Sequence, residues 1–406
     1  MRTTSSGPRS FVSFTGARSP RYPAPDVARG FMLLLIALAN APFWMVLFRT
    51  RAEVTGADTI WMGLRAALVD HRSYPLFAML FGFGLATMAH RRIEAGLRST
   101  GAAAPVADAR RLIRRRGLWM LVFAAVHGAL FMGDIIGAYA LIAVVLAGPI
   151  AGRGRRPLTV VGRLSAAVCL GYMLYIGWFI SAGGVTVGTA GAAGGIAGDI
   201  MEMLRGPLYP AVSLVLWAGD TMVTILTSLA LPAALLGVRL ADTDLLTRPD
   251  RHRRALLIGG VAALAVGALG ALPYMKLGAP TWMIVMGPAL NSLTGLVGAC
   301  GWLALLAAWA GPGTSAPLRG ARWLLSAVGR RSMTVYIGQS LLFALVFGTL
   351  RLAGAPAFNE VMGVSVAVAV WAALAMMCAW MERSGRTRGP LEILLRRAVA
   401  ASARRR

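Results

Sequence analysis

The sequence predicts an all-α integral membrane protein of about ten transmembrane helices. Of its 406 residues, 57% are hydrophobic and only 14% are charged, whereas soluble domains are about one-quarter charged. The mean hydropathy is +0.66. Apolar runs of roughly 18 or more residues, the length that crosses a bilayer, recur along the chain. The lipid bilayer is therefore the first partner that the sequence implies.

The apolar runs divide the chain into three parts. Residues 1–29 are rich in Arg, Ser and Pro, and we expect a disordered, basic cytoplasmic segment there. Residues 30–382 form the expected transmembrane domain. Its spans are Gly30–Phe48 and, at approximate limits, 73–90, 117–133, 135–152, 158–183, 210–238, 255–275, 281–311, 331–353 and 361–381. Residues 383–406 are a basic cytoplasmic tail, expected to lie as a helix or arm against anionic headgroups.

The basic residues predict the orientation of the spans. With the N-terminus inside, 34 of the 41 basic residues fall on the cytoplasmic side, in agreement with the positive-inside rule. Both termini are therefore expected in the cytoplasm. This distribution also explains the net charge of +25 without nucleic acid.

No motif for a metal or a tightly bound cofactor is present in the sequence. Cys169, Cys300 and Cys378 lie inside apolar runs without CxxC spacing, which indicates small core residues. Walker, HExxH and GxSxG motifs are also absent.

Five polar residues are predicted near the middle of the bilayer. They lie eight to ten residues into five different spans: Asn40, His127, Asp220, Asn291 and Gln339. Burial of such groups in hydrocarbon is costly, so each is a candidate for function. A single amide often only joins two helices by a hydrogen bond. The histidine and the aspartate are therefore the stronger candidates.

The stretch HGALFMGDIIGAYAL contains His127 and, seven residues later, Asp134. On one straight helix the two would share a face, about 10 Å apart. The predicted span ends at Gly133, however, so we expect His127 at mid-bilayer and Asp134 in an outer turn. There the aspartate either caps the next helix or serves the site.

A second candidate base precedes the span at 73–90. Asp70 is adjacent to His71, and a carboxylate beside a histidine can orient it as a general base. The alternative is a polar cap at the membrane interface.

Arginines mark two cytoplasmic helix ends. Asp26 and Arg29 precede the first span, and Arg330 and Arg331 begin the span at 331–353. Arginines at such positions can bind phosphates through paired hydrogen bonds. The alternative is that they only set the topology.

Four segments resemble the YeiB-like (DUF418) bacterial membrane proteins. In chain order they are DVARGFMLLLIALAN, YPLFAMLFGFGLA, HGALFMGDIIGAYAL and VGRRSMTVYIGQSLL, from residue 26 to about 345. One departure is Val335, where the family usually carries Asn. The resemblance implies a multi-pass protein of the bacterial plasma membrane, with a C-terminal family region at about 210–382.

The family is distantly similar to transmembrane acyltransferases, including the heparan-α-glucosaminide N-acetyltransferases. Those enzymes move an acyl group from cytoplasmic acyl-CoA to an acceptor by means of a histidine. Their Arg-Gly opening and second span are loosely matched by Arg29-Gly30 and by Asp70, Pro75, Phe81 and Gly82. The resemblance implies acyl-CoA as co-substrate and leaves His71 and His127 both open as the base.

Three functions follow as hypotheses. In an acyltransferase, Arg29 with Arg330 or Arg331 would hold the CoA phosphates, and a histidine would be the base. Further substrate contacts would come from Asn40, Thr334, Tyr336, Gln339 and Ser340. A transporter or lipid-handling protein would instead use Asp220 in a midplane site. The third hypothesis is a scaffold without catalysis.

Overall fold

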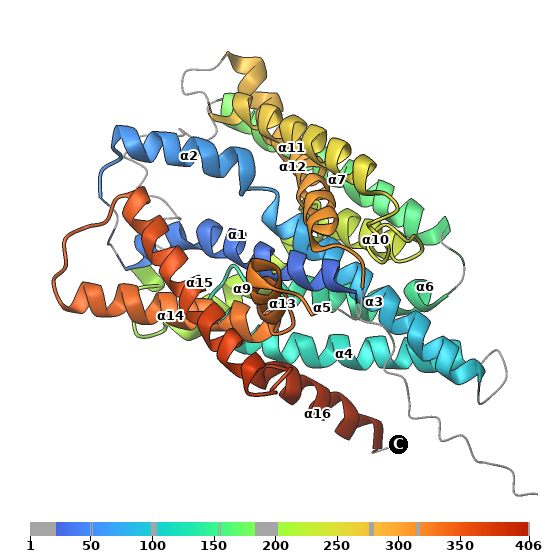
Figure 1. The fold of residues 1–406 in the computed structure, drawn as a ribbon. Helices are drawn as coiled ribbons and strands as arrows, with labels where there is room; N and C mark the ends of the chain where they lie inside the picture. Colours follow the sequence, from blue (N-terminus) through green and yellow to red (C-terminus); the bar gives the residue numbers. More distant parts are fainter. Residues whose placement is uncertain are drawn as a thin grey trace, which may run out of the picture.

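The computed structural model describes residues 22–404, apart from 49, 51, 99–103, 153, 155, 183–201, 276–279 and 314–316. The regular elements among these residues are α-helices (Figure 1). The predictions for residues 1–21 and for most of the glycine-rich stretch before residue 202 lie outside the described residues.

Seven described helices are long and apolar enough to cross a bilayer. They are α1 (Pro23–Leu47), α7 (Arg156–Ser181), α9 (Tyr209–Thr227), α11 (Arg253–Met275), α12 (Thr281–Ala310), α14 (Ser332–Leu352) and α15 (Glu360–Arg383). The chain is therefore a multi-pass, all-α membrane protein, as its composition predicts.

Four of the ten predicted spans, including the one that begins with α9, differ in length or continuity from the prediction. Two are longer than predicted and have charged ends, α3 (Ser73–Leu97) and α4 (Ala104–Gly128). Two are interrupted. The span at 135–152 divides into α5 (Ile136–Val145) and α6 (Ala147–Ala151), and the span at 210–238 divides into α9 and α10 (Ala230–Leu240).

Three helices lie outside the predicted spans. They are α2 (Gly56–Leu68), α13 (Gly320–Gly329) and α16 (Pro390–Arg404). The last agrees with the expected basic tail helix. Helix α2 begins with a capping box, in which the side chains of Thr55 and Asp58 satisfy backbone N–H groups reciprocally. In Figure 1, α2 and α16 lie on opposite sides of the bundle.

Helix α1 is the centre of the packing and contacts α3, α12, α13, α14 and α15. Its crossing with α13 requires glycine on both sides. A Cβ at Gly30 would lie 2.0 Å from the carbonyl oxygen of Leu325, and one at Gly329 would lie 1.9 Å from that of Asp26. Close approach through small residues is the usual packing of helices in lipid, where burial of apolar surface gives little drive.

Candidate functional site

The candidate site is centred on His127, at the end of α4. This helix ends at Gly128 rather than at Gly133, because the chain turns directly after the histidine, with the N–H of Phe131 bonded to the His127 carbonyl at 2.7 Å. The turn returns Asp134 to the imidazole, and its Oδ1 lies 2.7 Å from His127 Nδ1. The prediction that the two side chains lie apart is therefore wrong.

Ser340 completes a chain of three polar side chains. Its Oγ lies 2.9 Å from His127 Nε2, and it comes from α14, which is remote in sequence. Each of the three residues is 2% exposed. The imidazole thus bridges a carboxylate and a hydroxyl in a setting shielded from solvent.

The hydrogen bonds of Asp134 fix the roles of the two imidazole nitrogens. Its Oδ2 accepts from the backbone N–H of Gly137 at 2.9 Å and from Trp217 Nε1 at 3.2 Å. Two donors of this kind stabilise a carboxylate, which in turn accepts the proton on His127 Nδ1. Nε2 is then the free base and faces the Ser340 hydroxyl. This is the arrangement of a Ser-His-Asp relay.

Asp134 also stabilises the start of α5. Its bond to the Gly137 N–H satisfies a donor that has no partner inside the helix. The helix cap foreseen for this aspartate is therefore present, together with a contact to His127, whereas its role in the chemistry stays a prediction. Trp217 was not predicted from the sequence. The available signal was an indole N–H within an apolar span, which requires a buried acceptor.

Tyr336 and Gln339 lie beside this relay. The Tyr336 hydroxyl accepts from the Ile135 N–H at 3.3 Å, and its ring packs edge-on against His127 at 5.1 Å. Tyr336 precedes Ser340 by one helical turn on the same face of α14. Gln339 donates to the Leu33 carbonyl at 2.8 Å, and its buried Oε1 has no hydrogen-bond partner among the described residues.

The predicted phosphate-binding arginines are engaged within the protein. Arg330 and Arg331 share Glu382, at 2.7 and 2.9 Å. Arg29 pairs with Asp26 at 3.3 Å and donates to the Leu80 carbonyl at 3.0 Å.

Thr334 belongs to the start of α14. Its hydroxyl donates to Glu392 at 2.6 Å, and the same glutamate accepts from the N–H groups of Met333 and Thr334 at 2.8 and 3.1 Å. Glu392 belongs to α16. The C-terminal helix thus caps the helix that carries Ser340.

The group around His71 lies apart from His127. Asp70 forms an ion pair with Arg65 at 3.1 Å through Oδ2, and among the described residues no hydrogen bond joins its carboxylate to His71. His71 has φ 58° and lies 3.5 Å from Ser292 Oγ.

The remaining midplane candidates do not join the His127 group. Asn291 accepts from the fully buried Arg72 at 2.9 Å. Asp220 is exposed on α9, with Thr224 Oγ1 at 3.5 Å. Asn40 is half-buried on α1. The common depth of the five residues stays a prediction, but a common depth does not bring side chains together, and Asn291 and Asp220 hydrogen-bond partners outside the His127 group.

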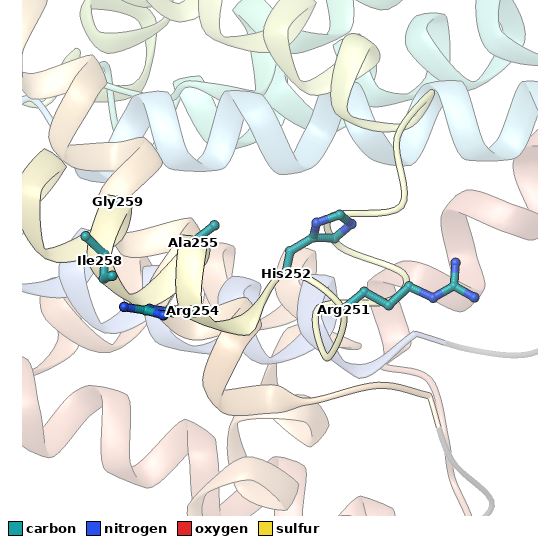
Figure 2. Close-up of a pocket in the computed structure, with 6 residues that line it drawn as sticks. All are labelled: Arg251, His252, Arg254, Ala255, Ile258 and Gly259. Atoms are coloured by element: carbon teal, nitrogen blue, oxygen red, sulfur yellow. The ribbon is translucent and has the colours of Figure 1, made fainter.

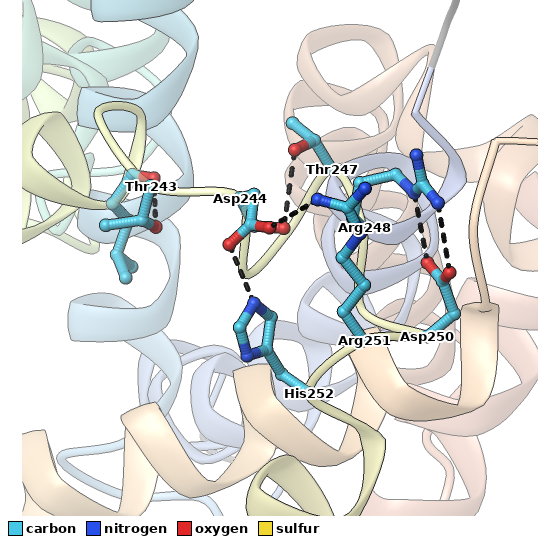
Figure 3. Close-up of polar contacts among 8 residues, drawn as sticks. Thr243, Asp244, Thr247, Arg248, Asp250, Arg251 and His252 are labelled. Carbon is cyan, nitrogen blue, oxygen red and sulfur yellow. Dashed lines mark hydrogen bonds and ion pairs between the residues drawn. The ribbon is translucent and has the colours of Figure 1, made fainter.

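A separate polar cluster occupies the loop before α11 (Figure 3). His252 Nε2 lies 2.7 Å from Asp244 Oδ1, and Arg251 pairs with the same carboxylate at 3.6 Å. The hydrogen bond with His252 is the main reason that the pKa of Asp244 lies below its usual value.

An open hollow of about 480 Å³ lies beside this loop, and Figure 2 shows the residues that line it. Arg251, His252 and Arg254 line it together with Ala255, Ile258 and Gly259. The hollow shares no residue with the His127 relay. Nowhere in the described residues are three or more His, Cys, Asp and Glu side chains grouped to hold a metal ion.

One family model matches this chain, and its description is "Protein of unknown function (DUF418)". The match covers residues 240–402. It includes Ser340, Tyr336 and α16, whereas His127 and Asp134 precede it. No curated protein and no solved structure matches the chain. Residues 240–402, which are less than half of the chain, are therefore similar to the DUF418, or YeiB-like, family.

Proposed function

We propose that the protein is an acyltransferase of the bacterial plasma membrane. It moves an acyl group from cytoplasmic acyl-CoA to a small-molecule, lipid or glycan acceptor at or across the membrane. The observation that carries the proposal is the hydrogen-bonded chain Asp134–His127–Ser340. A carboxylate, an imidazole and a hydroxyl in this order can activate the hydroxyl as a nucleophile.

The reaction has two balanced steps. In the first, Ser340 Oγ attacks the thioester carbonyl and His127 Nε2 takes its proton. The carbon–sulfur bond breaks, and CoA leaves as the thiol with that proton. In the second, an acceptor hydroxyl or amine gives its proton to His127 and attacks the acyl-serine. The product ester or amide leaves, and the proton returns to Ser340.

Two features support His127 over His71 as the base. Asp134 fixes the tautomer of His127 at 2.7 Å, whereas Asp70 is engaged by Arg65. His127 also faces a hydroxyl at 2.9 Å on its other nitrogen. Tyr336 is the candidate donor to the acyl oxyanion. Its bond to the Ile135 N–H uses an oxygen lone pair and leaves the hydroxyl proton for the substrate.

The proposed reaction also requires the number of membrane crossings and the side of each terminus to be assigned. We assign ten crossings, counting α5 with α6 and α9 with α10 as one crossing each, and both termini to the cytoplasm. In this arrangement α14 begins at the inner face. Ser340 lies eight residues after its first residue, Ser332, which is about 12 Å into the membrane. Acyl transfer at this depth suits a donor from inside and an acceptor from either side.

The transporter alternative rested on Asp220. Its side chain is exposed on α9 and hydrogen-bonds Thr224 rather than a member of the relay, so the acyltransferase is the better supported function.

The test is acyl transfer by the purified protein in nanodiscs, with radiolabelled acetyl-CoA and palmitoyl-CoA as donors. We expect CoA release and a label on the protein in the absence of acceptor. Ser340→Ala should lose the label, and His127→Gln should lose both label and release. Ser365→Ala is the matched control, because that serine is exposed on α15. Labelling that persists in Ser340→Ala would contradict the proposed nucleophile.

A further inference from the structure

Arg116 is a partly buried arginine whose charge is not matched. Its Nε is buried and has no hydrogen-bond partner, and its NH1 contacts only the weak acceptor Sδ of Met88, at 3.9 Å. Among the described residues, no carboxylate lies within ion-pair distance of it. Arg330 and Arg331, in contrast, are both paired with Glu382.

Arg29 approaches the same face of α3. It donates to the Leu80 carbonyl, and a Cβ at Gly84 would lie 3.1 Å from its NH2. Leu80, Gly84 and Met88 are spaced four residues apart, so they form one stripe along the helix. Arg29 therefore lies at the first two positions of the stripe and Arg116 at the third. Glycine at the middle position lets the Arg29 guanidinium lie close to the backbone of α3.

The electrostatics around Arg116 favour an anion. Arg29 and Arg396 repel its guanidinium, whereas Glu392 attracts it. Glu392, however, already caps the start of α14 and binds the Thr334 hydroxyl. Arg29 is itself paired with Asp26 at 3.3 Å, so it is chiefly the unused buried donor of Arg116 that a bound anion would stabilise.

We propose that Arg116 and Arg29, on either side of Gly84, form a binding site for a phosphate group. The two ligands with this chemistry are the phosphates of a nucleotide-like molecule such as CoA and the phosphodiester of an anionic lipid. Arginine suits both, since its planar fork of donors matches phosphate oxygens.

The position of Arg116 relative to His127 favours the CoA phosphates. The two residues are eleven apart on the continuous helix α4, which places them about 20° apart around the axis and about 16 Å apart along it. CoA carries its phosphates at one end and its thioester at the other end of an extended arm. One face of α4 would therefore contact both ends of CoA, the phosphates at Arg116 and the thioester at His127. The choice of CoA as the ligand rests on the proposed function. The phosphate site itself does not.

The test measures binding, independently of acyl transfer. The protein is purified in neutral phosphatidylcholine nanodiscs, and its thermal unfolding is followed with CoA, with inorganic pyrophosphate and with pantetheine, which lacks phosphates. A parallel sample in nanodiscs with phosphatidylglycerol tests the lipid. The variants are Arg116→Gln and Gly84→Leu, whose side chain displaces the Arg29 guanidinium and keeps both arginines. Arg114→Gln, an exposed arginine of the same helix, is the control.

If the ligand is CoA, then CoA and pyrophosphate stabilise the wild type and Arg114→Gln, and pantetheine does not. Arg116→Gln and Gly84→Leu then weaken binding at least tenfold. If the ligand is a lipid, only phosphatidylglycerol stabilises the protein, with the same dependence on Arg116. The site is overturned if neither CoA nor phosphatidylglycerol stabilises the protein. It is also overturned if Arg116→Gln and Gly84→Leu are stabilised as much as the wild type. Phosphate binding without acyl transfer would instead overturn only the proposed function.

Discussion

His127 owes its orientation to a carboxylate that follows it by seven residues across a turn. The imidazole is held at both nitrogens, by Asp134 at 2.7 Å and by Ser340 at 2.9 Å. A buried polar group with every bond made is rigid. The relay thus has the fixed geometry that proton transfer in a low-dielectric site requires.

Asp134→Asn tests the relay without removing the helix cap. An amide oxygen still accepts from the Gly137 N–H, but the neutral amide no longer stabilises the imidazolium formed during transfer. We expect acyl transfer to fall on the order of 10²- to 10⁴-fold, with little change in thermal unfolding. CoA release in nanodiscs measures the first and scanning fluorimetry the second.

Asp250→Asn is the matched control for this change, because Asp250 pairs with Arg248 in an exposed loop. Undiminished CoA release from a folded Asp134→Asn protein would show that the aspartate only shapes the turn.

The sequence predicts the members of this relay better than their contacts. Depth and spacing identify His127 and Asp134 as candidates, and the acyltransferase hypothesis names Ser340 only as a substrate contact. The contact depends on α4 ending five residues before the apolar run does, and hydropathy does not report where a helix ends inside an apolar segment. Arg116 was missed for another reason. It is the last of three consecutive arginines, and only its distance of eleven residues from His127 distinguishes it.

Helix crossings depend on reciprocal glycines. A Cβ at Gly82 of α3 would lie 1.9 Å from the Ala234 carbonyl oxygen, and one at Gly237 of α10 would lie 1.9 Å from that of Met79. The two backbones are therefore in contact, and neither can accept a methyl group without moving.

Gly82→Ala should destabilise the protein by about 1–3 kcal/mol through overpacking. The control is Gly219→Ala on α9, where an added Cβ meets nothing within 4 Å and helix propensity favours alanine. Thermal unfolding in one detergent compares the two. Equal melting temperatures of Gly82→Ala and Gly219→Ala would show that the close contact between α3 and α10 does not contribute to stability.

Asp58 joins α2 to α15, and its hydrogen bonds predict that the stability of the fold depends on pH. Its Oδ1 accepts from the Val361 N–H at 2.9 Å, and its Oδ2 accepts from the Thr55 hydroxyl at 2.6 Å. The Thr55 bond is the main reason that the pKa of Asp58 lies below the usual 3.8. The ionised form therefore stabilises the fold above pH 3.8, and this contribution is lost as the pH falls through the lowered pKa.

Asp58→Asn should consequently lower the melting temperature at neutral pH, and the difference from wild type should shrink below pH 3.8. Unfolding measured from pH 7 to pH 3 checks this. A difference that stays constant over the whole range would assign the effect to packing instead of charge.

The apolar runs predict most long helices but not their interruptions. Runs at 135–152 and 210–238 each divide into two helices, because an apolar sequence is compatible with a break as well as with a continuous helix. Helices α2 and α13 were missed since neither forms an apolar run long enough for a span. The capping box at Thr55 was a usable signal for the first of them.

At the scale of the whole molecule, the distribution of arginine predicts which face is cytoplasmic. Single cysteines test it after the three native cysteines are replaced by alanine. An impermeant maleimide added to intact spheroplasts should label Glu53→Cys, before α2. It should label Asp250→Cys and Thr387→Cys only after lysis. Labelling of Thr387→Cys in intact cells would invert the orientation, and acyl-CoA would then be unable to reach the phosphate site from inside.

The bond from Glu392 to the start of α14 has a consequence for how the gene can vary. The last helix is not a free tail, since its glutamate holds the element that carries Ser340, and the family match extends over it to residue 402. A stop codon after the last span at Arg383 would remove this support while sparing every crossing. Deletion of Pro390–Arg404 is therefore expected to behave as a loss of function, although it leaves the spanning helices in place.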